Sequence, residues 1–158
     1  MQPNSDEIRV LYERHARALV TYACSLLADF ATAEDVVHQV FQRLLRGDIE
    51  LHKPPLPYLY TAVRNATIDI LRTRPRNVAI AGDWFKNTTV SHEDVILLQS
   101  ALRELPEEQR EVVVMHVWGQ LTFEEIAAVF DIPPKTAASR YRYGLAKLRE
   151  QFKPVTKG

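Results

Sequence analysis

The sequence has a single cysteine, Cys24, among its 158 residues, so the chain cannot form an internal disulfide. Its setting, YACSLL, favours a small buried packing position over a redox sensor. The five histidines lack metal-ligand spacing, and neither a glycine-rich phosphate loop nor a nucleophile motif occurs. Clustered acids that would suit a nucleic-acid-modifying enzyme are also missing. We therefore expect no metal, no cofactor and no enzymatic activity.

Long hydrophobic runs are missing as well. No apolar stretch approaches the ~18 residues that a membrane span needs, and the N-terminus is polar and acidic, unlike a signal peptide. These features predict a cytoplasmic protein that does not bind a membrane. The 20 basic and 20 acidic residues cancel to a formal net charge of zero, so any affinity for nucleic acid must come from local patches.

The stretch from 121 to 150 predicts two helices joined by a tight turn. Thr122 suits an N-cap and forms a capping-box pattern with Glu125. The turn falls at residues 131–132. The proline pair at 133–134 ends the first helix and suits the first turn of the second. This pattern is typical of a helix-turn-helix.

The second of these helices, about 134–150, is strongly basic. Between Lys135 and Arg149 it carries five cations and no acid. Helical spacing turns several polar and basic residues outward, namely Lys135, Ser139, Arg142 and Tyr143, with Thr136, Arg140 and Lys147 along one flank. Cations that neutralise phosphates, beside short polar side chains that reach base edges, suit a DNA major groove. A surface helix with a solvated basic face remains an alternative on this pattern alone.

Two helices are predicted near the N-terminus, at about 6–29 and 33–46. Thr32 suits the N-cap of the second, with Asp35 three residues on, and Gly47 suits its left-handed C-cap. The second helix buries an apolar stripe and turns a polar face outward, composed of Asp35, His38, Gln39, Gln42, Arg43 and Arg46. This face has room for a protein partner, and a plain solvated face is the alternative.

A third N-terminal helix is expected to start at Pro57 and to end before Pro75. Asn65, Asp69 and Arg72 share one of its faces, and Arg64 lies beside them. The segment is net positive by three, since Arg64, Arg72, Arg74 and Arg76 stand against Asp69. A second basic helix, far in sequence from the first, favours an extended nucleic-acid footprint.

The region between these helices and the helix-turn-helix has weak periodicity and many turn residues. Residues 77–91 read as a linker, in which Trp84 and Phe85 are unusual and suit an anchor to a surface. A helix capped by Ser91 follows, and another runs from Pro106 to Gly119. The sequence thus predicts an all-α fold of two small helical domains, residues 5–76 and 92–153.

Three strings in order carry a family resemblance: TAEDVVHQVFQRLLRG, PYLYTAVRNATIDILRTR and ALRELPEEQREVVVMHVWGQLTFEEIAAVFDIPPKTAASRYRYGLAKLRE. The chain resembles bacterial RNA polymerase sigma factors of the extracytoplasmic-function group, within the sigma-70 family. That group has sigma domain 2 and sigma domain 4 joined by a linker. The resemblance covers nearly the whole chain and is far more specific than the helix-turn-helix alone.

The resemblance implies roles for particular residues. Asp35, Gln39, Gln42 and Arg43 match positions that bind core RNA polymerase. The loop 47–57 matches one that traps a flipped-out base of the minus-ten element. Minus-ten recognition is implied for Arg64, Asn65, Asp69 and Arg72. Minus-thirty-five recognition is implied for Lys135, Thr136, Ser139, Arg140, Arg142, Tyr143 and Lys147. The chain departs from the usual family pattern at His38, Gln39, Ala137 and Ala138, so we expect altered core binding and an altered promoter sequence.

The implied function is promoter recognition, DNA opening and transcription initiation as a subunit of RNA polymerase. The implied partners are core RNA polymerase and promoter DNA, and an anti-sigma protein remains an open candidate. A standalone helix-turn-helix regulator is the alternative, although it leaves the first two strings unexplained. We also expect the free protein to be compact, with the two domains packed together beside the linker. The alternative is that Trp84 and Phe85 merely cover an apolar patch on one domain.

Overall fold

The computed structural model describes residues 4–73 and 99–151, and the predicted all-α class is confirmed. The helices are α1 (Ser5–Leu27), α2 (Phe30–Arg46), α3 (Pro55–Thr73), α5 (Glu107–Val117), α6 (Phe123–Phe130) and α7 (Pro134–Gln151), and residues 99–104 are also helical. Several predicted features lie outside the described residues: Arg74, Pro75, Arg76, the linker 77–91 with Trp84 and Phe85, and the cap at Ser91.

The junction of α1 and α2 differs from the prediction. Helix α1 ends at Leu27, and its C-cap Ala28 has a left-handed φ of 56°. Asp29 then caps α2. The Asp29 carboxylate accepts hydrogen bonds from the Thr32 backbone N–H at 3.5 Å and from the Thr32 hydroxyl at 2.6 Å. The prediction that Thr32 is the N-cap was therefore wrong, because Asp29 caps the helix one turn earlier.

The ends of the neighbouring helices agree better with the sequence. Gly47 has a φ of 78°, and its N–H bonds to the carbonyl groups of Arg43 and Leu44, which confirms the predicted C-cap. Helix α3 starts at Pro55, two residues before the predicted Pro57. Either proline fits a first turn, which needs no backbone donor.

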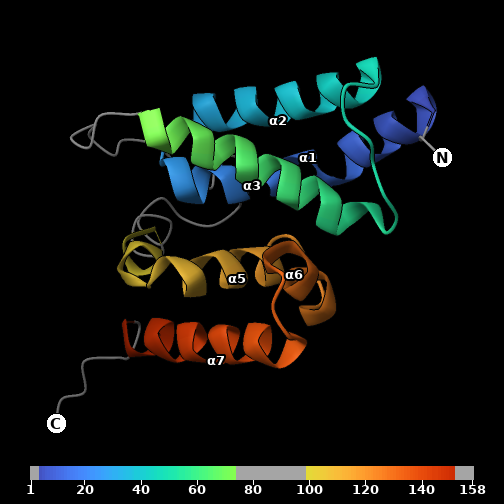
Figure 1. Ribbon diagram of the computed structural model, residues 1–158. Coiled ribbons are helices and arrows are strands. Elements are labelled where there is room, and N and C mark those ends of the chain that lie inside the picture. The colour runs from blue at the N-terminus through green and yellow to red at the C-terminus, as the bar shows by residue number, and fades with distance from the viewer. Residues whose placement is uncertain (1–3, 74–98, 152–158) are drawn as a thin grey trace, which may run out of the picture.

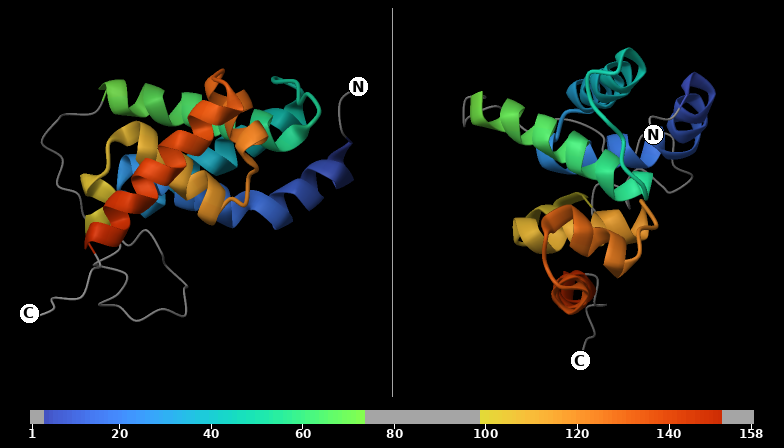
Figure 2. Two further views of the ribbon diagram at one scale, coloured as in Figure 1. Left: turned by 90° about the horizontal axis from the view of Figure 1, so that it is seen from below. Right: turned by 45° about the vertical axis from the view of Figure 1, so that its right-hand side comes forward.

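The helices form two groups that pack against each other (Figures 1 and 2). Helices α1, α2 and α3 make one group, and α5, α6 and α7 make the other. The groups meet where α1 contacts α5 and α3 contacts α6. Helix α2 lies on the far side of the first group and α7 on the far side of the second, as both figures show. The described residues thus adopt the compact arrangement that we expected.

Helix α5 is buried on almost all sides because it lies between α1 and α7. Four successive apolar residues, Val112 to Met115, are buried, as a helix at the centre of an assembly requires. In the first group, the interior is made by apolar residues of all three helices, including Leu19, Val37 and Leu59. Cys24 is fully buried there, with 0% exposure, which confirms its predicted packing position.

The helix-turn-helix forms as its pattern predicted. The Thr122 hydroxyl accepts a hydrogen bond from the Glu125 N–H at 3.1 Å, and the Glu125 carboxylate accepts one from the Thr122 N–H at 2.9 Å. Asp131 then turns the chain with a left-handed φ of 55°. The predicted capping box and turn are therefore confirmed, and together they fix the direction in which α7 begins.

Gly144 of α7 is needed for the close approach of α7 to α5. A Cβ atom placed on it would lie 2.9 Å from Val113 Cγ2 and 3.3 Å from Gln109 Cβ. Val113 is buried and cannot move far, so a side chain at Gly144 must push the two helices apart. The position of the basic helix thus depends on this glycine.

We expect Gly144→Leu to lower the free energy of unfolding by ~1–3 kcal/mol through overpacking. Thermal unfolding followed by circular dichroism measures the effect. Ala146→Leu is the matched control, because Ala146 is exposed on the same helix. An equal loss in both variants would mean that the close approach at Gly144 does not limit the packing.

Candidate nucleic-acid interface

Helix α7 presents the predicted reading face to solvent. Ala137, Gly144 and Leu148 are its buried residues. The residues predicted to face DNA lie elsewhere on its surface: Lys135, Arg142, Tyr143 and Lys147 are exposed, and Thr136, Ser139 and Arg140 are half-buried. Tyr143 has 65% of its surface exposed, which is unusual for a large aromatic residue. The Arg142 guanidinium donates a hydrogen bond to the Ser139 hydroxyl at 3.2 Å, so these two predicted residues are neighbours.

Arg140 is held differently from the other cations of α7. Its guanidinium forms an ion pair with Glu108 of α5 at 3.2 Å, and its side chain is only 25% exposed. The contact fixes Arg140 at the edge of the helix facing α5. This agrees with its predicted place on a flank of the outer face.

An aromatic cluster fixes α7 against the rest of the helix-turn-helix. The His116 ring stacks on Phe123, with centroids 4.5 Å apart, and meets the Tyr141 ring edge-on at 4.6 Å. His116 Nδ1 donates to the Leu121 carbonyl at 2.9 Å, which holds the ring in place. The face of α7 opposite Tyr141 is therefore presented in a set orientation.

A groove of about 490 Å³ lies between α2 and α3. The loop after α2 contributes Ile49, and Tyr58 stands at the start of α3. The groove also brings together residues from two predicted sites: Gln39 and Arg43 from the polymerase-binding set, and Asn65 and Asp69 from the minus-ten set. The sequence did not predict this meeting, because it depends on how α2 packs on α3.

Three more of the predicted residues, Asp35, Gln42 and Arg72, are also exposed. Arg72 forms an ion pair with Asp69 at 3.5 Å near the end of α3. Asp35 is exposed on α2. Gln42 lines a different groove, of about 560 Å³, between α1 and α2. In that groove the Tyr12 hydroxyl and His38 Nε2 are 2.7 Å apart, so His38 bonds to α1.

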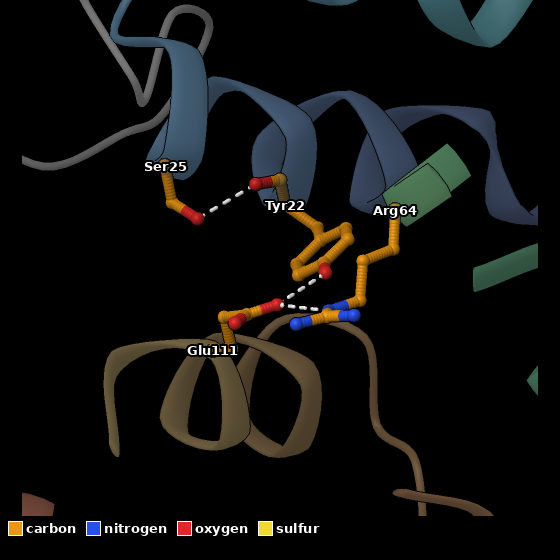
Figure 3. Close-up of polar contacts among 4 residues, drawn as sticks. All are labelled: Tyr22, Ser25, Arg64 and Glu111. Carbon is orange, nitrogen blue, oxygen red and sulfur yellow. Dashed lines mark hydrogen bonds and ion pairs between the residues drawn. The ribbon is translucent and has the colours of Figure 1, made fainter. Parts of the chain in front are cut away.

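Arg64 points toward the second helix group (Figure 3). Its Nε donates to Glu111 Oε1 of α5 at 2.9 Å, and the same oxygen accepts a hydrogen bond from the Tyr22 hydroxyl at 2.6 Å. The Arg64 guanidinium also lies over the Phe130 ring of α6, 4.9 Å from the centroid. Arg64 thus lies on a different face of α3 from Asn65 and Asp69.

Burial and charge perturb this cluster. Burial, and then the charge of Glu111, raise the pKa of the Tyr22 hydroxyl well above its usual value, so it stays protonated and donates. Burial alone would lower the pKa of Arg64, but the hydrogen bond and charge of Glu111 outweigh it, and the pKa is raised. Both groups therefore keep the protons that they donate to Glu111.

Sequence reasoning did not single out Glu111 or Tyr22. The available signal was the position of Glu111 directly before the buried run 112–115, since a charge there must be paired when the helix is buried. Within residues 4–73 and 99–151, no group of three or more His, Cys, Asp or Glu could hold a metal ion. None of the helices in the same ranges is long and apolar enough to cross a membrane.

Comparisons with known proteins match this architecture. Residues 11–77 match the family model for sigma-70 region 2, and residues 96–148 match that for sigma-70, region 4. The chain is 32% identical to the ECF RNA polymerase sigma factor SigL of Mycobacterium tuberculosis, over 90% of this chain and 86% of that one. It is also 32% identical to the RNA polymerase sigma factor CarQ of Myxococcus xanthus, over 92% and 88%.

A solved structure has the same fold. The sigma factor RpoE of Bartonella quintana, in complex with the anti-sigma factor NepR, superposes with a TM-score of 0.74 at 23% identity, over 96% of this chain and 97% of that chain. The two family matches occur in the predicted order, so a standalone helix-turn-helix regulator is not favoured. The chain therefore belongs to the ECF, or extracytoplasmic-function, group of RNA polymerase sigma factors, which are not enzymes but direct the polymerase to promoters.

Proposed function

We propose that this sigma factor binds core RNA polymerase through α2 and reads promoter DNA at two places, in the groove between α2 and α3 and along α7. We assign residues 5–76 to sigma domain 2, 77–91 to the linker and 92–153 to sigma domain 4. The observation that carries the proposal is the separation of these polar surfaces: α2 and α7 lie on opposite outer sides of the molecule (Figure 2).

The exposed face of α7 supports minus-thirty-five recognition. Lys135 and Lys147 are exposed and can neutralise phosphates, whereas Arg142 can make a bidentate contact with a guanine edge. Tyr143 adds a large exposed ring with a hydroxyl. Such a combination of backbone-binding and base-reading groups suits a helix in the major groove.

The groove between α2 and α3 supports minus-ten recognition. Its volume of about 490 Å³ is in the range of small-ligand sites. Tyr58 offers an aromatic ring for stacking, and Asn65 offers an amide for a base edge. Arg43 can bind a phosphate beside them. These features suit a base taken out of the duplex, whose unstacking must be offset by such contacts.

The exposed polar face of α2 supports binding to core RNA polymerase. Asp35, Gln39, Gln42 and Arg43 all lie on it, while Phe41 and Leu44 of the same helix are buried. A helix whose other face forms the core presents these groups rigidly. An anti-sigma protein is a further proposed partner, as for the RpoE relative that was solved with NepR. We place the whole activity in the cytoplasm.

In vitro transcription with core RNA polymerase and genomic DNA tests the proposal. We expect a stable complex with the core enzyme and new start sites downstream of a shared pair of sequence elements. A chain that binds DNA alone and forms no complex with core polymerase would contradict the proposal. That outcome would favour a standalone regulator.

A further inference from the structure

The contact between the two helix groups centres on one buried carboxylate. Glu111 of α5 keeps 4% of its side-chain surface exposed, and a single oxygen, Oε1, accepts from both Tyr22 of α1 and Arg64 of α3 (Figure 3). The three residues thus come from three helices, two in the first group and one in the second. We call Tyr22, Arg64 and Glu111 the latch.

The latch is satisfied only while the groups are together. A buried carboxylate must be paired and hydrogen-bonded, and both of its described partners belong to the other group. A second hydrogen bond also joins the two groups: Arg110 of α5 donates to the Ser25 carbonyl of α1 at 3.4 Å. If the groups separated, these polar atoms would lose their protein partners and be exposed to water.

The latch uses Arg64, a cation for which the family resemblance implies minus-ten binding. Arg64 is 30% exposed, with Glu111 on its Nε and the Phe130 ring over its guanidinium. Glu107 and Arg72 line the groove of about 340 Å³ beside them. Acidic residues of α5 therefore lie where Arg64 would otherwise meet a phosphate.

We propose that Glu111 is an internal substitute for a DNA phosphate on Arg64, so that the closed arrangement and minus-ten binding by Arg64 exclude each other. The proposal rests on the proposed function and on the minus-ten role that the family resemblance implies for Arg64. Within residues 4–73 and 99–151, the outer faces of α2 and α7 stay exposed while the latch is formed (Figure 2). Polymerase can therefore engage α2 in the closed protein, whereas Arg64 becomes available only after opening. A partner can shift this equilibrium by no more than its differential affinity for the two states.

Small-angle scattering on the full chain tests the closure. The wild-type protein should have a radius of gyration near ~15 Å, the value for one compact body of this length. Glu111→Gln removes the charge with little change of shape, and Tyr22→Phe removes the hydroxyl donor. Both variants should have a clearly larger radius of gyration. Glu108→Gln is the matched control, because Glu108 pairs with Arg140 inside the second group. Its radius should match that of the wild type.

Binding to single-stranded DNA tests the release of Arg64. The probe is a labelled oligonucleotide of mixed sequence, titrated by fluorescence anisotropy at several salt concentrations. Glu111→Gln should bind several-fold more tightly, with the slope of log K against log salt steeper by about 0.7, as for one added phosphate contact. The double variant Arg64→Ala, Glu111→Gln should lose this gain. Glu124→Gln removes an exposed acid of the same helix group and should show no such change.

Unchanged radii in both latch variants would overturn the proposal, as would a DNA gain that persists without Arg64. Circular dichroism checks that the variants are folded. If Glu111→Gln loses helicity, the radius of gyration of Tyr22→Phe decides the test of closure. The scattering result does not depend on polymerase. If the chain fails to bind core polymerase but the latch variants still open, the proposed function fails and the closure stands.

Discussion

Replacing Arg142 by alanine is expected to weaken promoter binding by ~1–3 kcal/mol and to relax specificity at one position of the upstream element. Arg142 is exposed on α7 and is oriented by its hydrogen bond to Ser139. A long guanidinium in this place can reach a base edge. Competition binding against a panel of single-base variants of a mapped upstream element measures both effects.

Arg140→Ala is the matched comparison for this experiment. Arg140 lies on the flank and pairs with Glu108, so its loss should weaken binding about equally on every variant of the element. If the two substitutions cause the same sequence-independent loss, the assignment of outer face and flank on α7 is wrong.

The second large effect is expected on α2. Asp35→Ala combined with Gln39→Ala should reduce affinity for core polymerase by ~2 kcal/mol or more, because both residues lie on the face of α2 that is proposed to bind the polymerase. Both side chains are exposed, so helicity should be unchanged. A competition assay with a second sigma factor for the core enzyme measures the loss.

Glu34→Ala is the control for this pair. Glu34 is exposed on the same helix, one residue and about 100° away from Asp35. Undiminished affinity of the double variant would refute the role of this face. Because Gln39 also lines the groove to α3, a defect confined to DNA opening would instead assign Gln39 to the minus-ten contact.

Local sequence patterns predicted most of the helix ends. The capping box at Thr122 and the C-cap at Gly47 depend on residues within four positions of each other, so short-range chemistry decides them. Asp29 and Thr32 are both good caps, three residues apart, and the choice between them depended on where α1 ended. That end is a left-handed alanine, Ala28, which no propensity favours.

The candidate site was less predictable, because its geometry depends on long-range packing. Helical periodicity placed Arg64 beside Asn65, and 100° of rotation between them sends one to α5 and the other to α2. The partner of Arg64 lies 47 residues downstream, so no local pattern could reveal it. The exposure of Asn65, Asp69 and Arg142 followed from periodicity alone, since each lies opposite a buried stripe.

The closed arrangement, with α7 on the far side of the second group, limits the length of DNA that one molecule can span. Elements named for positions minus ten and minus thirty-five are about 25 base pairs apart, on the order of 85 Å along B-form DNA at 3.4 Å per step. A compact body with a radius of gyration of ~15 Å is only about 40 Å across. The closed protein is thus too short to span the distance between the two promoter elements. For the proposed reading of both elements by one molecule, the two helix groups must move apart by tens of ångströms. The spacing between the elements would then itself select the extended form.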